Sequence, residues 1–456
     1  MDPAGGQGAG AGGPAAADDS SAGTWASPLG SWLRGILDDP FSRVPSVGRV
    51  FETLRIELEK APVLGVVFVR LDYWGAAVEL CGWKDLERVY QVVSGVTVDI
   101  MGKELRRVDL PADIGLHGEG LAVFLSAPRG DTTLGISVVD MVGNRVGAAV
   151  RQRIGEELPA EVAERICVDI GSGLLGRPTG DDTLEDVVLA ALIAADKASR
   201  AAQRDRLEKR AEQLVQILEA GPLQVTYRPI VDALAQRVVG FEAFAEGPVH
   251  PDLRLGDVLL DTARRSGLAY RAYDAYHHAA VIGAEGGLAD DDLLVLEVSA
   301  SELLESAVRV LALLFRRGVS HLTPGNIVFT VQAHEVVAQF PPVLAASRSV
   351  ADMGFKLAVH LAPDGPLPFD LLRELRPDIL RVGGRTVREL GRNQDEFDLL
   401  LMLSRFAGRH GMGMMATDCS DQADLLALSR SGVNLVQGDA VAPRQARPVK
   451  AGVSGR

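Results

Sequence analysis

Cysteine and aromatic residues are scarce in this chain. Of its 456 residues, three are cysteine and 5% are aromatic. Cys81, Cys167 and Cys419 lie far apart and form neither a CxxC pair nor another metal-ligand spacing. These counts argue against a disulfide-stabilised secreted domain and a structural zinc site, so a reduced, cytoplasmic setting is expected.

The chain also lacks a long apolar run and an excess of basic residues. No stretch approaches the roughly 20 apolar residues that a membrane-spanning helix needs. The N-terminus has no basic start followed by an apolar stretch, so no secretory signal is expected. Acidic residues outnumber basic ones by 61 to 47, which gives a formal net charge of −14. Generic nucleic-acid binding needs a basic face, so no nucleic-acid partner is expected.

What is present is enough apolar sequence, 47%, for two or three globular domains. Residues 1–24 are rich in Gly, Ala, Ser and Asp and are expected to be a disordered tail, as are residues 446–456. The lead-in segment, residues 25–47, carries two tryptophans and either packs on the first domain or docks a partner. Residues 48–200 alternate between helical and strand patterns, with a hairpin over 112–128. This order predicts an α+β domain with one central antiparallel sheet.

Residues 198–220 are rich in strong helix formers and end at Gly221-Pro222, which predicts a helix that connects two domains. Leu207, Ala211, Leu214 and Leu218 recur at spacings of four, three and four. This apolar stripe either packs on its own domain or forms a two-helix coiled coil between two protomers. From 221 to 445, about eight strand patterns alternate with helices, which predicts a (β/α)₈-type barrel.

Four segments of the second half carry family motifs in order. Residues 227–231 read Tyr-Arg-Pro-Ile-Val, residues 241–244 read Phe-Glu-Ala-Phe, residues 376–381 read Arg-Pro-Asp-Ile-Leu-Arg, and Gln437-Gly438 precedes Ala442-Pro443. Together they resemble the EAL domain of cyclic di-GMP phosphodiesterases. The resemblance implies a barrel whose strand ends hold two divalent cations around a phosphodiester, a task that needs a ring of oxygen ligands.

Most of the ligand positions that the resemblance implies hold other residues. Glu242 matches the signature glutamate, and Glu297 stands in place of an asparagine and could still ligate a metal. The remaining positions are expected to have lost their roles, because each holds a different residue from the family's. Phe329 replaces a carboxylate, His360-Leu361 replaces the aspartate pair, Arg381 replaces the catalytic lysine, Gly383 replaces an aspartate and Thr417 replaces a glutamate. Asp418 could compensate only after a loop shift. Glu242 is then expected to be a carboxylate paired with a neighbour.

Binding of cyclic di-GMP without turnover is disfavoured by the same comparison. In relatives that bind without cutting, an arginine grips the phosphate two residues beyond the signature leucine. Here that position is Glu246, whose negative charge repels phosphate. Arg228 replaces a glutamine nearby and is a possible substitute cation. We therefore expect neither catalysis nor a metal site nor another cofactor.

The first half resembles a GGDEF domain. His117-Gly118-Glu119-Gly120 falls at the signature hairpin, and Asp169-Ile170-Gly171 and Ala195-Asp196 match later motifs. The magnesium-binding Asp-x-Asp reads Arg70-Leu71-Asp72, and Val78 stands where an asparagine contacts guanine. The resemblance implies that cyclase activity is lost. Arg106 and Asp109 resemble the inhibitory RxxD site, although a solvated ion pair is the simpler interpretation.

Three functions follow, in this order of preference. The first is a non-catalytic signalling or scaffold protein that keeps both folds and acts through protein partners or self-association. The second is a receptor for cyclic di-GMP or GTP without turnover. The third is an active phosphodiesterase or cyclase.

Overall fold

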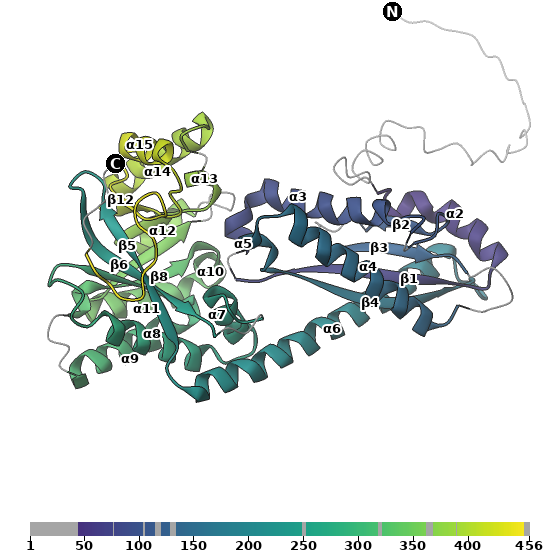
Figure 1. Ribbon diagram of the computed structural model, residues 1–456, viewed down its shortest axis with the longest axis horizontal. Coiled ribbons are helices and arrows are strands. Elements are labelled where there is room, and N and C mark those ends of the chain that lie inside the picture. The colour runs from purple at the N-terminus through teal and green to yellow at the C-terminus, as the bar shows by residue number, and fades with distance from the viewer. Residues whose placement is uncertain are drawn as a thin grey trace, which may run out of the picture.

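The computed structural model describes residues 44–75, 77–103, 105–114, 120–127, 134–248, 252–317, 322–361, 368–388 and 390–450. Two bodies lie side by side and are joined by one long helix, α6 (Leu184–Ala220), which runs beneath both (Figure 1). The first body is an antiparallel sheet with helices, and the second is a closed barrel.

The first domain is a four-stranded antiparallel sheet in the order β2-β3-β1-β4. Its elements are α2 (Val47–Lys60), β1 (Val63–Tyr73), α3 (Ala77–Asp99), β2 (Leu110–Asp113), β3 (Gly120–Leu125), α4 (Ile136–Glu157), α5 (Ala160–Ala163) and β4 (Ile166–Gly176). The central strand β1 is buried along nearly its whole length. The expected antiparallel sheet is therefore present.

The period of two along β1 builds the two cores of this domain. Val67, Val69 and Leu71 pack with apolar residues of α3 and α4 on one face. Val66 and Phe68 pack with those of α2 and α6 on the other. A strand covered on both faces reads as a continuous apolar run, which is the pattern that the sequence shows here.

The hairpin expected over 112–128 corresponds to β2 and β3, which pair in antiparallel register from Leu110↔Phe124 to Asp113↔Leu121. Gly120 opens β3 opposite Arg70 of β1. A Cβ at Gly120 would lie 2.6 Å from the Phe68 ring, so close packing of this ring requires glycine there. His117, Gly118 and Glu119 lie outside the described residues.

Helix α6 unites two segments expected separately, the closing helix of the first domain and the connector over 198–220. Thr183 caps its start in a reciprocal capping box with Asp186. At the far end Leu214 is fully buried in the barrel cluster, and Leu207 and Leu218 pack against that cluster. The apolar stripe thus packs on its own chain, as the first of the two alternatives expected.

The second domain is a closed barrel of eight strands, as expected, in the order β10-β11-β12-β5-β6-β7-β8-β9. The strands are β5 (Gln224–Asp232), β6 (Arg237–Glu246), β7 (Leu293–Glu297), β8 (Ile327–Gln332), β9 (Lys356–Leu361), β10 (Ile379–Val382), β11 (Gly413–Ala416) and β12 (Leu435–Val436). The outer helices are α7 (Gly256–Arg265), α8 (Ala269–Ala284), α9 (Leu303–Arg317), α10 (Ala333–Ala338), α11 (Phe340–Asp352), α12 (Phe369–Leu375), α13 (Arg385–Arg388), α14 (Gln394–Arg409) and α15 (Gln422–Ser431).

One strand departs from a uniform (β/α)₈ barrel. Strand β5 is antiparallel to both of its neighbours, β6 and β12. A short turn joins β5 directly to β6, and a parallel pair would have required a crossover of a dozen or more residues. The carboxyl ends of the other seven strands therefore meet the amino end of β5 at one mouth of the barrel.

Two apolar layers define which side chains point inward. A small cluster fills the barrel interior and consists of Ile230, Val295, Val328, Ala358, Ile379 and Met415. A much larger cluster joins the outward side chains of the same strands to the helices. Inward and outward residues alternate along each strand, as the pleat requires.

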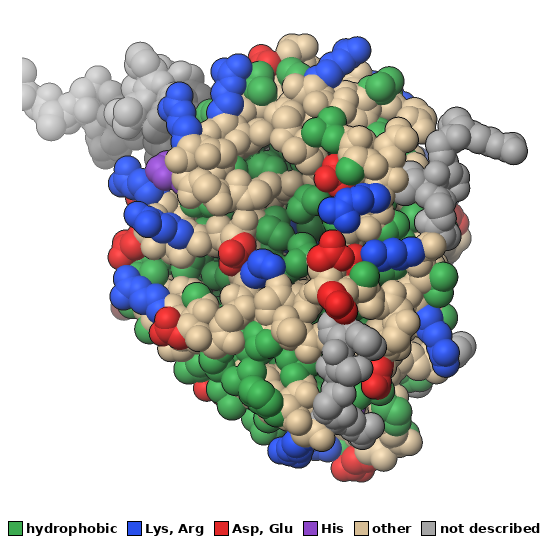
Figure 2. Space-filling model, turned by 90° about the vertical axis from the view of Figure 1, so that its left-hand side faces the viewer, with side chains coloured by type: hydrophobic (Ala, Val, Ile, Leu, Met, Phe, Trp, Pro, Cys, Tyr) green, Lys and Arg blue, Asp and Glu red, His purple; other side chains and the backbone are tan. Residues whose placement is uncertain are grey.

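On the side of the barrel farthest from the first domain, hydrophobic side chains line a central hollow, and charged side chains lie around it (Figure 2). Within the described ranges, the structure contains no helix with the length and apolar character needed to cross a membrane.

A charged cluster around Trp74 fastens the two domains. Trp74 is 1% exposed and packs with the barrel core, with the guanidinium groups of Arg210 and Arg265 over its ring at 4.3 and 4.2 Å. Its indole Nε1 donates to Asp72 Oδ2 at 2.7 Å. Asp72 also accepts from Arg206 of α6 at 2.5 Å and from Arg265 of α7 at 3.0 Å. One carboxylate of the first domain thus joins the linker helix to the barrel.

Replacing Asp72 by asparagine should destabilise the protein, because two largely buried arginines lose a shared countercharge. Loss of one partner from such a network costs roughly 3 kcal/mol. Burial by itself would raise the pKa of Asp72, but Gln203, Arg265 and Arg206 hold it below its ordinary value. The stabilisation is therefore present at neutral pH and is lost as the solution is acidified below about pH 4.

Thermal unfolding at pH 7 measures the effect of Asp72→Asn. The matched control is Asp99→Asn, since Asp99 is 51% exposed and meets Arg153 at 3.3 Å on the surface. We expect the control to unfold within about a degree of the wild type, because exposed ion pairs contribute little. Equal midpoints for the two variants would contradict a fastening role for Asp72.

Candidate functional site

The barrel mouth carries a polar layer directly above the apolar interior layer. Strand alternation turns the following residues inward there: Arg228 of β5, Glu242 of β6, Glu297 of β7, Thr330 of β8, His360 of β9, Arg381 of β10 and, just after β11, Thr417. Six strand-end positions of the family resemblance were expected around one mouth, and five of them lie there: Glu242, Glu297, His360, Arg381 and Thr417. This is the end of the barrel at which ligands bind in barrel enzymes.

Phe329 is the exception, and its expected place at the mouth is wrong. The ring points outward into the helical layer, where it meets His277 and Phe355 at centroid distances of 5.7 and 5.3 Å. Its neighbours Val328 and Thr330 face the interior instead. A strand shows alternate residues to one side, so an alignment displaced by one residue exchanges inside for outside. Leu361, also expected at an ion position, lies in the outer cluster for the same reason.

Glu242 and Arg381 form a buried ion pair across the barrel interior. Arg381 Nη2 lies 2.7 and 2.8 Å from the two carboxylate oxygens of Glu242, and both side chains are about 5% exposed. Arg381 Nη1 donates to Thr330 Oγ1 at 3.0 Å. The expectation that Glu242 is a paired carboxylate is confirmed. The guanidinium contacts both carboxylate oxygens through one nitrogen and neutralises the negative charge that would otherwise attract a divalent cation.

Glu297 is the second carboxylate of the mouth and lies at the end of β7. Burial raises its pKa to about 7, and the charges of Asp257, Glu242 and Glu335 act in the same direction against the opposing charge of Arg264. Near pH 7 the carboxyl group is therefore divided between its protonated and ionised forms, and the protonated form is a poor ligand for a hard cation.

His360, Gly383, Thr417 and Asp418 form the opposite wall. Burial and the charge of Arg381 lower the pKa of His360 well below its ordinary value, so its ring is neutral. A Cβ at Gly383 would lie 2.1 Å from Thr417 Oγ1, so no larger residue fits there. Asp418 adopts a left-handed conformation, with φ of 62°, and accepts the Gly384 amide at 2.9 Å. Its carboxylate is thus committed to the backbone.

A second arginine lies near Arg228 at the outer rim of the mouth. Arg228 Nη2 contacts Asp439 Oδ1 at 2.9 Å, while its buried Nε has no hydrogen-bond partner among the described residues. Arg444 lies 3.8 Å over the Phe244 ring and 3.4 Å from Glu246. Burial and the charge of Arg228 lower the pKa of Arg444. Glu246 is therefore not an isolated negative charge, which weakens the electrostatic case against anion binding.

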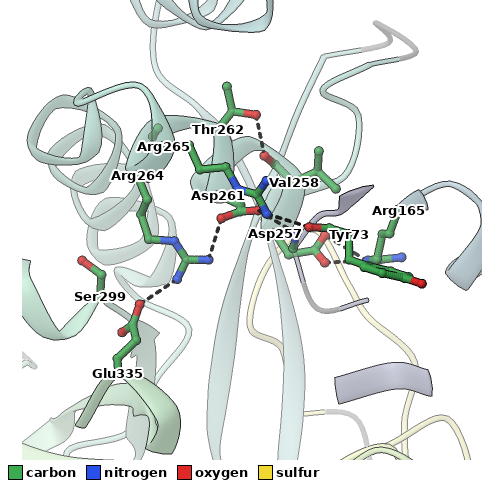
Figure 3. Close-up of polar contacts among 12 residues, drawn as sticks. Tyr73, Arg165, Asp257, Val258, Asp261, Thr262, Arg264, Arg265, Ser299 and Glu335 are labelled. Atoms are coloured by element: carbon green, nitrogen blue, oxygen red, sulfur yellow. Dashed lines mark hydrogen bonds and ion pairs between the residues drawn. The ribbon is translucent and has the colours of Figure 1, made fainter. Parts of the chain in front are cut away.

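The first domain reaches across this mouth. Arg165, two residues beyond α5, donates from Nε and Nη2 to the carboxylate of Asp257, which follows β6, at 2.6 and 3.0 Å (Figure 3). Within the barrel, Arg264 Nη1 of α7 donates to Glu335 Oε1 at 3.0 Å (Figure 3). Glu161 of α5 meets Arg388 after β10 at 2.8 Å. Strands β6 and β10 are four positions apart in either direction around the ring of eight. The segment 161–165 thus contacts opposite sides of the rim.

The expected site residues of the first domain serve packing and domain contacts in this structure. Arg70 turns toward α6, where Nε donates to Ser199 at 3.2 Å and Nη2 pairs with Asp196. Asp72 belongs to the Trp74 cluster described above. Gly120 packs under Phe68, and the side chain of Val78 lies outside the described residues.

Arg106 and Asp109 do not form the solvated ion pair expected from sequence. Asp109 is buried and accepts the backbone amides of Arg106 at 2.7 Å and Ser126 at 2.9 Å. The Arg106 guanidinium donates to the carbonyls of Ser126 and Ala127. Burial raises the pKa of Asp109 in spite of these bonds. The pair closes a turn against the end of β3.

The described residues contain no group of three or more His, Cys, Asp or Glu side chains placed to hold a metal ion. The sequence also left several mouth residues unassigned: Thr330, Arg444, Asp439 and Arg264. Strand parity alone could have found Thr330, since it is the inward neighbour of Phe329. The other three come from loops or helices, where no period identifies the facing residue.

Glu297→Gln should remove the contribution of Glu297 to the pH dependence of stability. A raised carboxyl pKa means that the folded state holds a proton that the unfolded state releases above about pH 4.5. The contribution of Glu297 to the stability therefore falls as the pH rises from about 5 toward 8. Glutamine cannot ionise, so the free energy of unfolding of Glu297→Gln relative to that of the wild type should increase by about 2 kcal/mol across that range.

Urea unfolding between pH 5 and 8 tests this, with Glu305→Gln on the exposed side of α9 as the control. The control should track the wild type at every pH. A constant difference between Glu297→Gln and the wild type would show that Glu297 ionises normally in the folded protein.

The comparisons with known proteins concern mainly the second domain. The EAL domain family matches residues 211–444, just over half of the chain. No curated protein matches. Among solved structures, the FimX EAL domain of Xanthomonas citri in complex with c-diGMP has 18% identity and a TM-score of 0.46, with 54% of this chain and 96% of that chain covered.

Two further structures are similar. The Vibrio cholerae LapD S helix-GGDEF-EAL, bound to c-di-GMP, has 12% identity and a TM-score of 0.47, with 90% of this chain and 97% of that chain covered. The EAL domain of Mycobacterium smegmatis DcpA has 19% identity and a TM-score of 0.41, with 49% and 92% covered. The family match over residues 211–444 identifies this chain as a member of the EAL domain family.

Proposed function

We propose that this chain is a non-catalytic signalling or scaffold member of the EAL family, acting through protein contacts. The observation that carries the proposal is the buried Glu242–Arg381 pair. Hydrolysis of a phosphodiester by two metal ions needs several anionic oxygen ligands around an open position. Here one carboxylate is neutralised by a guanidinium, and burial raises the pKa of Glu297 to about 7, so only part of its population is ionised at neutral pH.

The first domain, in this proposal, is a degenerate GGDEF domain. In its favour are the antiparallel sheet, the hairpin that Gly120 closes and the helix that follows β4. Arg70 and Asp72, at the positions of the family's magnesium ligands, are engaged by Asp196, Arg206 and Arg265. A cation at that place would have to displace two arginines from Asp72, which is costly in a buried setting.

The proposed role as a scaffold rests on how the domains are joined. Trp74 and Asp72 fasten the sheet domain to the barrel, and segment 161–165 contacts two sides of the barrel rim. Such a body presents one composite surface to a partner. Fold alone does not specify the partner, so the chemistry of recognition has to come from experiment.

The purified chain, with Mg²⁺ or Mn²⁺, should neither hydrolyse cyclic di-GMP nor make it from GTP, because the described residues of the mouth form no open ring of oxygen ligands. Chromatography of the nucleotides after prolonged incubation measures both reactions. Turnover that disappears in Glu242→Gln would refute the proposal. A strictly monomeric protein that also captured no partner from extracts of its own cells would leave the scaffold role without support.

A second candidate is a receptor for cyclic di-GMP without turnover, favoured by the two neighbouring arginines at the rim. Arg228 has a buried Nε that lacks a partner, and Arg444 is close enough to Arg228 to have a lowered pKa. Arginine pairs bind phosphate oxygens well. Solved relatives are described as complexes with cyclic di-GMP, including the FimX EAL domain. Glu246 and Asp439 still compete for both cations.

Calorimetric titration with cyclic di-GMP should therefore show binding no tighter than about 1 μM. Arg228→Met should weaken any such binding at least tenfold. The control is Arg405→Met on the exposed side of α14, which should leave the affinity unchanged. Sub-micromolar binding that neither substitution alters would contradict a role for the rim arginines.

A further inference from the structure

Helix α9 carries two apolar faces, and the barrel covers only one of them. The covered face packs into the large barrel cluster and consists of Leu303, Ala307, Val310 and Leu314. The second face lies on the other side of the helix and consists of Val308, Leu311, Ala312 and Phe315. A helix on the surface of a globular protein normally presents polar side chains opposite its buried face. Apolar residues on both sides are instead typical of a helix that a second surface covers.

The second face of α9 is open to solvent. Phe315 is 79% exposed, the largest fraction among the large hydrophobic side chains of the described residues, and Val308 is 51% exposed. Tyr270 of α8 extends this surface, because the Arg309 guanidinium of α9 lies 4.1 Å over its ring. Helix α9 lies on the outer flank of the barrel, away from the first domain (Figure 1). Single exposed apolar residues are common, but a group of them marks a contact surface.

A hollow of about 760 Å³ lies beside this face, between α8 and α9. Tyr270, Val308 and Ala312 are among the residues that line it. Phe315 follows Val308 by two helical turns, which is roughly 10 Å along the axis, and its ring projects to solvent. One helix therefore presents a hollow near one end of its exposed face and a projecting aromatic ring near the other.

The exposed charges of α9 are arranged in the same complementary way. Glu305 is exposed near the start of the helix, and Arg316 is exposed near its end. Two copies of α9 that pack side by side in antiparallel orientation bring Glu305 of one copy toward Arg316 of the other. Parallel copies would place like charges together, which is unfavourable. The charges of this face therefore match those of its own antiparallel copy.

We propose that a second copy of this chain covers the face, with the two α9 helices antiparallel about a two-fold axis between Leu311 and Ala312. Each Phe315 ring then enters the hollow of the other copy beside Val308 and Tyr270, and the small side chain of Ala312 lets the helices approach closely. A two-fold contact uses the same patch on both copies, so every interaction occurs twice. The inference rests on the proposed function, in which the chain acts through protein contacts, and it names the surface and the partner.

Sedimentation equilibrium of the full chain measures this dimer. We expect a monomer–dimer equilibrium with a micromolar dissociation constant, because a contact built on one helix from each copy lies at the small end of specific interfaces. Phe315→Ser should weaken the dimer by about tenfold or more, since two buried rings are lost. The control is Leu189→Ser on α6 of the first domain, where Leu189 is 58% exposed. It should leave the dimer unchanged, and thermal unfolding checks that both variants fold.

The orientation of the two helices is tested by exchanging their charges. Arg316→Glu should weaken the dimer, because it places an acidic group near Glu305 of the other copy. Adding Glu305→Arg to the same chain should restore the affinity, since opposite charges then face each other again. Recovery in the double variant is not expected if Arg316→Glu acts only by disturbing the fold.

A chain that stays monomeric at about 100 μM, a dimer that survives Phe315→Ser, or a double variant without recovery would overturn the inference. A monomer that uses Phe315 to bind anionic lipid vesicles or a helix of another protein would assign the face to that occupant instead. Turnover of cyclic di-GMP would refute the proposed function and leave the dimer standing. A monomer that captures a different protein would do the reverse, so the two proposals can fail separately.

Discussion

When the eight-stranded barrel closes, every second side chain of each strand points into a narrow interior. An ionisable side chain there must either pair with an opposite charge or become neutral by gaining or releasing a proton. Arg381 and Glu242 meet this condition by pairing with each other at 2.7 Å across the barrel. Glu297 meets it by holding a proton, and His360 by remaining neutral. The chemistry available at the mouth follows from this constraint, since a carboxylate paired with a guanidinium is a poor ligand for a hard divalent cation.

The same logic governs the contact between the domains. Asp72 is nearly buried, and its charge is tolerated because Arg206, Arg265 and Trp74 surround it. Each of these comes from a different part of the chain, so the contact forms only when sheet, linker helix and barrel are assembled. Residues 161–165 add ion pairs at the rim of the mouth. Access to the mouth and the placement of the first domain are therefore physically linked.

Residues that depart from a family pattern need not be functionless remnants. Gly383 is required because Thr417 leaves no room for a Cβ, and Gly120 because the Phe68 ring packs over it. Asp109 closes a turn with two backbone amides. Arg70 and Asp72 bind groups on α6 and α7. In each case the residue has a packing or polar partner in the fold, so its identity has a structural reason.

Sequence by itself determined the eight strands, the antiparallel first sheet and the two helical segments that form α6. These follow from periodicity, which is a local property. The mouth as the meeting point of Glu242, Glu297, His360, Arg381 and Thr417 was implied by the resemblance to the EAL domain. Tertiary structure alone decided that Phe329 faces outward, that α6 packs its leucines on the barrel, and that Arg381 is the partner of Glu242. Neither the side to which Phe329 points nor the pairing of Glu242 with Arg381, 139 positions apart, can be read from the local sequence pattern. Both are determined only when the strands close into a barrel and the buried charges pair.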